Sequence, residues 1–415
     1  MTYQEALEWI HSKLTFGIKP GLERMAWMLV ELGNPQENLK AVHVVGTNGK
    51  GSTTSYLQHI FSQSGYEVGT FTSPYIVDFR ERISLNGQMI TESDFVALVE
   101  RVQPVVERLH HETDLEPATE FEVITVLMFE YFGHMHPVDI AIIEAGMGGL
   151  YDSTNQFKAL AVVCPSIGLD HQAVLGQTYG QIAEQKVGVL KEAVPFIYAN
   201  NQADVEAVFQ AKAQETKSPT YKLGRDFSTA LHGDTFDYQS QLGEIEDIHL
   251  RMPGQHQVSN ASLAITTSLL LAQQFPKVTP ATIKAGLEAT AWAGRTELLA
   301  NNLMIDGAHN NESIDALVEV MKAYADKKVH VLFAAINTKP ADAMLKRLEA
   351  VGQVSVTTFE DYRALALEDY PKGYVRVENW QDWLEQMNLD SEDDFYLITG
   401  SLYFISQVRK AFLKR

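Results

Sequence analysis

Residues 42–52, VHVVGTNGKGS, decide how the N-terminal part of this chain is expected to fold. The first four are mostly β-branched and predict a strand, and residues 53–64 have the apolar spacing of a helix. A glycine-rich loop, residues 46–52, joins the two. Glycines let backbone N–H groups turn towards one anion, the N-terminus of the helix adds partial positive charge, and Lys50 adds a full charge. The stretch therefore predicts a cradle for a triphosphate.

The loop departs from the common P-loop expression at two positions. Counting back from Gly49 and Lys50 puts Val44 where the first glycine normally stands, and Gly51 replaces the usual Ser or Thr. Ser52 is then expected to supply the hydroxyl that contacts Mg²⁺. The loop alone leaves an alternative open, a strand-to-helix turn that binds nothing.

Composition restricts the class of protein. A chain of 415 residues with 45% hydrophobic content predicts two domains. Thirty-three basic and 53 acidic residues give a net charge of −20, which argues against nucleic acid and anionic membranes as partners. The single cysteine, Cys164, lies in an apolar run and is expected to be a buried, inert thiol in a reducing cytosol. Without a cationic leader or a membrane-length apolar segment, we expect a cytoplasmic protein.

Three polar residues are expected to meet at one edge of a parallel sheet. Ser73 follows a predicted strand, Glu144 ends the buried run VDIAIIE, and His171 follows the next predicted strand. Ligand-binding residues collect at the carboxyl ends of such strands. Beside a phosphate cradle, this combination indicates a Mg²⁺ site. Each residue alone is also explained as a strand end or a neighbour of a helix cap, and only the set of three favours the metal.

The loop GTNGKGS resembles the nucleotide loop of the folylpolyglutamate synthase and dihydrofolate synthase branch of the Mur ligase superfamily. The likeness extends over nearly the whole chain as an ordered series of motifs: GIKPGLERM, TSPY, FRERI, TEFE, IEAGMGG, DSTN, LDHQ, EQKVGVLK, GQHQVSNA, GRTE, IDGAHN and ITGSLY. The resemblance implies an ATP-dependent ligase that adds L-glutamate to the γ-carboxylate of reduced folates. It implies an acyl-phosphate intermediate and release of ADP and phosphate.

The resemblance also carries site residues over, position by position. Nucleotide contacts are expected at Thr47, Asn48, Gly49, Lys50, Gly51, Ser52, Asn260, Arg295 and Asp306. Metal contacts are expected at Ser52, Ser73, Glu144, His171 and Lys186, and Lys186 matches a lysine that the family carbamylates. Substrate contacts are expected at Arg82, Phe121, Asp152, Ser153, Thr154 and Ser401. Catalytic roles are expected for Lys50, His171, Lys186, Arg295 and His309.

The expected fold class is α/β, with a P-loop-type ATPase domain on a mainly parallel sheet and a smaller, Rossmann-like C-terminal domain. We predict an ATP-, Mg²⁺- and folate-binding domain at residues 1–292, a linker at 293–298 and a glutamate-ligase domain at 299–415. ATP is expected between the domains, with Arg295 acting on closure. The cofactors are ATP and Mg²⁺, the substrates are reduced folate and L-glutamate, and the protein is expected to be a monomer.

Two departures from the family pattern leave alternatives open. Residues 334–340, AAINTKP, lack the acidic residue that commonly precedes the lysine, as in a nucleotide-binding paralogue with reduced ligase activity. The presence of Lys186 among the metal residues favours the ligase. Ile18-Lys19-Pro20 stands where bifunctional enzymes carry Ile-Asp-Leu, so a bifunctional dihydrofolate synthase is the second alternative. A muramyl-peptide ligase is disfavoured by the folate-type TSPY and DSTN motifs.

Overall fold

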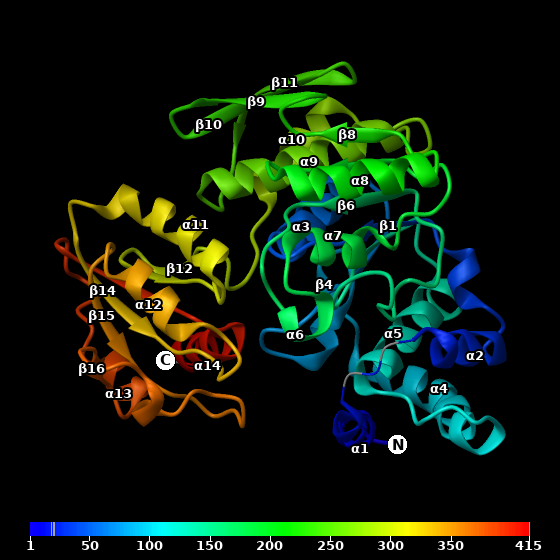
Figure 1. Cartoon of the computed structure of the whole chain (residues 1–415), viewed down its shortest axis with the longest axis horizontal. Coiled ribbons are helices and arrows are strands. Elements are labelled where there is room, and N and C mark those ends of the chain that lie inside the picture. The colour runs from blue at the N-terminus through cyan, green and yellow to red at the C-terminus, as the bar shows by residue number, and fades with distance from the viewer. Residues whose placement is uncertain (18, 20, 415) are drawn as a thin grey trace. The chain divides into compact units, whose positions relative to one another are not determined.

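The computed structural model describes residues 1–17, 19 and 21–414, which form two compact units. Unit 1 comprises Met1–Leu250 and Ser259–Thr290, and unit 2 comprises Arg251–Val258 and Ala291–Arg415. Each has its own sheet with flanking helices (Figure 1). The sequence did not reveal that the short segment Arg251–Val258 packs with the C-terminal unit.

Unit 1 is built on an eight-stranded sheet with the order β4-β3-β2-β5-β1-β6-β7-β8. The six strands from β2 to β8 in that order are parallel, while β3 and β4 are antiparallel additions. The bounds are β1 Ala41–Val44, β2 Val68–Phe71, β3 Ile83–Leu85, β4 Gln88–Met89, β5 Ile140–Glu144, β6 Ala161–Cys164, β7 Phe196–Tyr198 and β8 Thr220–Lys222. The central strands β1, β5 and β6 are buried throughout, as strands covered on both faces must be. The predicted mainly parallel sheet is confirmed.

Helices bury both faces of this sheet. Helix α3 packs against β1, β2 and β5, while side chains from α1, α2, α4 and α5 share a core with alternate strand residues such as Ala141 and Ile143. The helices are α1 Tyr3–His11, α2 Glu23–Glu31, α3 Lys50–Gln63, α4 Glu92–Glu112, α5 Glu120–Glu130, α6 Gln172–Leu175, α7 Tyr179–Val187, α8 Ala203–Glu215, α9 Gln255–Leu271 and α10 Pro280–Ala289. Shorter helical turns of unit 1 are Ser12–Phe16, Pro35–Asn38, Phe79–Arg82 and Tyr131–Met135, and those of unit 2 are Lys322–Tyr324 and Leu367–Asp369.

The predicted hairpin around Asn86-Gly87 is confirmed. Strands β3 and β4 pair Leu85 with Gln88, leaving a two-residue loop. Its residues have φ angles of 49° and 78°, which is the left-handed conformation that such a loop requires and that Asn and Gly adopt most easily.

A second sheet in unit 1 was missed from the sequence. Strands β9 Phe227–His232, β10 Thr235–Ser240 and β11 Gly243–His249 form an antiparallel meander, and α10 packs against β11. Only β10 carries a usable signal, because buried Phe236 and Tyr238 alternate with polar residues. The polar composition of the two outer strands hid the rest.

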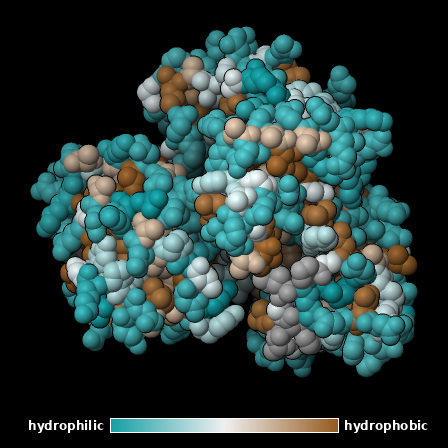
Figure 2. Space-filling view, in the orientation of Figure 1, coloured by the Kyte–Doolittle hydropathy of each residue, from teal (hydrophilic) through white to brown (hydrophobic). Residues whose placement is uncertain are grey.

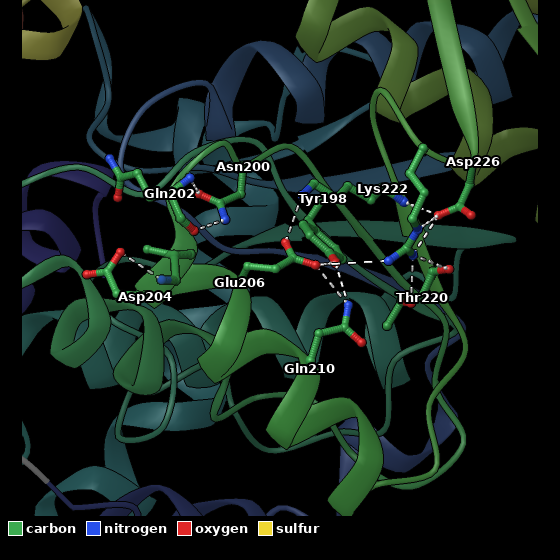
Figure 3. A network of polar contacts seen from close by, with 11 residues as sticks. Tyr198, Asn200, Gln202, Asp204, Glu206, Gln210, Thr220, Lys222 and Asp226 are labelled. Atoms are coloured by element: carbon green, nitrogen blue, oxygen red, sulfur yellow. Dashed lines mark hydrogen bonds and ion pairs between the residues drawn. The ribbon is translucent and has the colours of Figure 1, made fainter.

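Polar contacts connect β7 and β8, at one edge of the large sheet, to helix α8 (Figure 3). The Tyr198 hydroxyl at the end of β7 donates to Glu206 Oε1 at 2.8 Å, and Gln210 Nε2 donates to both groups. Lys222, at the end of β8, places its Nζ 3.1 Å from Glu206 Oε2. These contacts connect the two short strands to one helix.

Unit 2 contains a six-stranded sheet with the order β12-β13-β17-β14-β15-β16, parallel except for β12. The strands are β12 Glu297–Ala300, β13 Leu303–Ile305, β14 Lys328–Phe333, β15 Gln353–Val356, β16 Val375–Arg376 and β17 Asp394–Thr399. The helices are α11 Asn311–Met321, α12 Ala341–Leu348, α13 Trp380–Glu385 and α14 Leu402–Phe412. Its apolar core draws on β14, β17, α11 and α12. The predicted smaller C-terminal α/β domain is confirmed.

The surface is mostly hydrophilic, with scattered apolar residues on the face that Figure 2 shows. Among the described residues, none of the helices combines the length and apolar character that crossing a membrane requires. Cys164 is fully buried, and burial raises the pKa of its thiol to about 12. The thiol is therefore protonated at neutral pH, as expected for an inert cysteine.

Candidate active site

The loop between β1 and α3 has a shape that needs glycine. Gly46 and Gly49 have φ angles of 143° and 86°. A Cβ atom on Gly49 would lie 2.5 Å from Asn260 Oδ1 and 2.9 Å from Pro165 Cβ, so no larger residue fits without movement. Helix α3 begins at Lys50, and its N-terminus adds partial positive charge at the loop. This geometry fits phosphate groups.

The segment that follows β6 holds the loop in place. Thr47 N donates to Ser166 O at 2.8 Å, and Gly168 N donates to Thr47 Oγ1 at 2.9 Å. Asn48 N donates to Ser166 Oγ at 3.0 Å. Thr47 and Asn48 therefore organise the loop in addition to their predicted nucleotide contacts.

Glu144 lies beside the loop because β5 pairs with β1 in register, Val44 opposite Glu144. Its side chain is nearly buried, and its Oε1 is 3.9 Å from Lys50 Nζ. Lys50 itself is the first residue of α3, and its side chain is 16% exposed. A carboxylate and an ammonium group thus face the same cradle, as a magnesium triphosphate requires.

The sheet order brings the predicted metal residues to one edge. Strands β2, β5, β1 and β6 are neighbours, and Ser73, Glu144, the loop and His171 follow their carboxyl ends. Ser52 in α3 is buried, whereas the His171 side chain is half-exposed. Within residues 1–17, 19 and 21–414, no three His, Cys, Asp or Glu side chains gather to hold a metal. A metal here would depend on two serine hydroxyls and the Glu144 carboxylate together with His171 and Lys186, and its site stays a prediction.

Lys186 points at the nucleotide loop from α7. It is buried, and its Nζ donates to Gly46 O at 2.8 Å. Burial, and then the neighbouring Lys50 ammonium, lower the pKa of Lys186 to about 7. A substantial fraction of the amine is therefore neutral at physiological pH, which is the form that reacts with CO₂ to give a carbamate.

Three polar residues of unit 2, namely Arg295, Asp306 and His256, interact with one another. Asp306 accepts from Thr296 N at 2.7 Å and from Ala308 N at 2.8 Å, so its carboxylate orders the turn at Arg295. Loss of hydration lowers the pKa of His256, and the Arg295 charge adds to this effect while Asp306 opposes it. His256 is a site candidate that sequence reasoning missed, although it lies inside the quoted GQHQVSNA motif.

His309 and Ser401 follow the carboxyl ends of β13 and β17, which are paired in the same sheet. The His309 ring contacts Gly307 O through Nδ1 at 2.8 Å, and Ser401 caps α14 by accepting from Tyr403 N at 3.2 Å. The altered segment 334–340 is held in the same sheet, since Ala334 N donates to Thr399 O. His309 and Ser401 therefore have structural contacts in addition to their predicted roles with glutamate.

The predicted substrate residues have different surroundings. The Arg82 guanidinium lies over the rings of Tyr75 and Phe79, with its Cζ 5.3 and 5.2 Å from their centroids. Phe121 packs against Gly146, where a Cβ would lie 2.4 Å from its ring. Asp152 and Thr154 are buried, while Ser153 is half-buried between them. Their substrate contacts stay predictions.

A buried ion pair joins the motifs GIKPGLERM and TEFE, and the sequence did not reveal it. Arg24 Nε, in α2, donates to Glu122 Oε1, in α5, at 2.8 Å, and both side chains are almost completely buried. The preceding run Ile18-Lys19-Pro20 lies, except for Lys19, outside the described residues.

Comparison with known proteins bears on the whole chain. The Mur ligase middle domain matches residues 44–268, and the Mur ligase glutamate ligase domain matches residues 294–402. The dihydrofolate synthase/folylpolyglutamate synthase of Bacillus subtilis is 38% identical, over 98% of each chain. The chain belongs to the folylpolyglutamate synthase branch of the Mur ligase family.

Other members of the Mur ligase family support the same assignment. The folylpolyglutamate synthase of Lacticaseibacillus casei is 36% identical over 100% of this chain and 99% of its own length. A solved FPGS-AMPPCP-folate complex has a TM-score of 0.87 and 34% identity, with both chains completely covered. The folylpolyglutamate synthase of Thermotoga maritima has a TM-score of 0.85 and 31% identity, over 99% of this chain and 96% of its own. The Mur ligase fold is thus shared along the full length.

Proposed function

We propose that this protein is an ATP-dependent ligase that adds L-glutamate to the γ-carboxylate of reduced folates. The observation that carries this proposal is the arrangement of Lys50, Glu144 and Lys186 around the glycine loop, in a chain with full-length folylpolyglutamate synthase relatives. A chain that only bound nucleotide would have no chemical use for a buried lysine of lowered pKa beside its phosphates.

Activation of the folate carboxylate is the first chemical task. Its oxygen attacks the γ-phosphorus of ATP, which gives an acyl phosphate and ADP. Lys50 and the N-terminus of α3 offset the charge on the transferring phosphoryl group, and the glycine loop positions it. The glutamate amine then attacks the acyl carbon, phosphate leaves, and an amide remains.

Magnesium fits the donors at this edge of the sheet. Ser52, Ser73 and Glu144 would hold one ion through hydroxyl and carboxylate oxygens, and His171 with a carbamylated Lys186 would hold a second. Bound there, Mg²⁺ supplies positive charge to the phosphate oxygens. Arg295, Asp306 and Asn260 are proposed to contact ATP, and His309 and Ser401 to receive the incoming glutamate.

The assay that tests the function is ADP release with tetrahydrofolate, ATP, Mg²⁺ and L-glutamate, with each component omitted in turn. We expect turnover only in the complete mixture, and a product heavier by one glutamyl residue by mass spectrometry. ATP binding without turnover would instead support the nucleotide-binding paralogue. Turnover with a muramyl peptide in place of folate would move the chain to another branch of the family.

Replacement of Glu144 or His171 by alanine is expected to weaken the dependence on Mg²⁺. The two residues approach from separate strands, so each loss should lower ADP release at fixed Mg²⁺ by at least about tenfold. Mg²⁺ titrations of the reaction measure this. His232→Ala, in the separate three-stranded sheet, is the matched control. Unchanged titration curves in both site variants would show that neither Glu144 nor His171 holds a magnesium ion.

Reduced folates are expected to be better substrates than dihydropteroate. Where bifunctional enzymes carry an aspartate acceptor, Lys19 offers only donors, and its Nζ is already 3.0 Å from Glu116 Oε2. A buried donor left unpaired lowers affinity by roughly 10- to 100-fold. Side-by-side kcat/KM values at saturating ATP and glutamate measure the preference. Comparable values would instead favour the bifunctional alternative, which the name of the Bacillus subtilis relative also supports.

We also infer a monomer that works in the cytosol. The support is a single buried cysteine, which a reducing compartment tolerates, and a net charge of −20, which opposes self-association. Light scattering coupled to size exclusion would test the monomer, for which the expected mass is 46.4 kDa.

A further inference from the structure

A buried chain of hydrogen bonds starts at His43 in β1, a few residues before the nucleotide loop. His43 is 1% exposed, and its Nε2 lies 2.8 Å from Thr154 Oγ1. The Thr154 hydroxyl also bonds to Asp152 Oδ1, and Asp152 Oδ2 accepts from Met147 N at 2.8 Å. The strand that leads into the nucleotide loop is therefore connected to the segment that follows Glu144.

The proton positions in this chain follow from the partners. Both oxygens of Asp152 act as acceptors, Oδ1 from Thr154 N and Oδ2 from Met147 N. Burial raises the pKa of Asp152, and the hydrogen bonds that it accepts oppose this rise. A hydroxyl has one proton, so Thr154 donates to Asp152 and must accept from His43. His43 therefore carries a proton on Nε2. Burial, with a smaller effect of the Lys191 charge, lowers the pKa of His43 to about 3, which keeps the ring neutral.

The segment at the Met147 end of this series of hydrogen bonds lies against two residues with proposed roles in the reaction. Gly146 directly precedes Met147, whose amide donates to Asp152, and Gly149 follows Met147 by two residues. A Cβ on Gly146 would lie 2.4 Å from the Phe121 ring, and a Cβ on Gly149 would lie 2.4 Å from Lys186 O. The segment 146–149 is thus in close contact with the side chain of Phe121, the proposed folate residue, and with the backbone of the helix that carries Lys186.

We propose that His43 is a positioning residue: its Nε2–H orients Thr154, Thr154 orients Asp152, and Asp152 fixes the segment 146–149 on the folate side of the site. The inference rests on the proposed function for its effect on catalysis. The hydrogen-bonded connection between His43 and the segment 146–149 does not depend on the proposed function. It also gives Asp152 and Thr154 a defined task even if they do not touch the substrate themselves.

The kinetic test compares His43→Leu with His43→Gln, because the glutamine amide can donate from a similar position and leucine cannot. We expect His43→Leu to raise the KM for folate by about 10- to 100-fold while the KM for ATP stays within about twofold. His43→Gln should recover most of the loss. Equal behaviour of the two variants, or an equal rise in both KM values, would overturn the proposal.

A double-variant cycle tests whether His43 acts through Thr154. Thr154→Val alone should resemble His43→Leu, and His43→Leu/Thr154→Val should be no worse than either. Fully additive losses would show that the two side chains act independently, contrary to the proposal.

Two measurements on the folded protein do not depend on turnover. Hydrogen exchange of the 146–149 amides should be faster in His43→Leu than in the wild type or His43→Gln. In ¹⁵N-histidine spectra of the wild type, His43 should keep the Nε2–H form from pH 5 to 8. This range extends about 1.5 pH units to either side of the pKa of an unperturbed histidine. An Nδ1–H form, or unchanged exchange in His43→Leu, would overturn the connection. If instead the wild type fails to glutamylate folate, the proposed function is wrong while these two measurements still stand.

Discussion

Replacing Lys50 by alanine is expected to reduce glutamate ligation by about 10³-fold or more, with a melting temperature within a few degrees of the wild type. The rate falls because Lys50 supplies the full positive charge at the N-terminus of α3 where the triphosphate binds. The fold should tolerate the change because Lys50 has opposing neighbours. It attracts Glu144 at 3.9 Å but also repels the buried Lys186 ammonium.

The measurement is initial-rate ADP release together with thermal unfolding of both proteins. Lys40→Ala is a matched control, because Lys40 is exposed and precedes the other end of the same strand, β1. It should leave both quantities unchanged. Normal turnover by Lys50→Ala would mean that the nucleotide loop is wrongly assigned.

Breaking the Arg24–Glu122 ion pair is expected to lower the free energy of unfolding of unit 1 by about 3–5 kcal/mol. Arg24→Met leaves the Glu122 carboxylate buried, and among the described residues Thr119 N and Oγ1 still donate to it. Arg24 Nη2 also donates to Lys19 O, so the chain before α2 loses a contact as well.

Urea denaturation followed by tryptophan fluorescence measures this, since Trp9 and Trp27 lie in the first two helices of the same unit. Arg24→Met/Glu122→Gln should recover part of the loss, because the amide removes the charge that has no partner. Arg108→Met, which breaks exposed pairs with Glu31 and Glu112, should cost about 1 kcal/mol or less. If Arg24→Met is as mild as Arg108→Met, the buried pair contributes little.

Local sequence signals were sufficient for several elements. The nucleotide loop and the Asn86-Gly87 hairpin were predictable because a left-handed backbone favours Gly and Asn in any fold. Long apolar runs identified β5 and β6, since a strand covered on both faces must be apolar throughout. These features depend only on residues near each other in the chain.

Contacts between distant residues could not be predicted in this way. Arg24 and Glu122 are 98 residues apart, and His43 and Thr154 are 111 apart, so no pattern of spacing relates them. The three-stranded sheet was missed because its outer strands carry few apolar residues. His43 itself resembles an ordinary polar residue in a strand until its neighbours are known.

The sequence by itself determined the glycine loop with its lysine, the series of family motifs and the α/β class. Only the tertiary structure decided that β5 lies between β2 and β1, which brings Glu144 to the loop, and that α7 buries Lys186 against Gly46 O. Strand order and burial depend on how distant segments pack. The pKa of Lys186 therefore follows from the folded surroundings, because removal of water and the charge of Lys50 lower it.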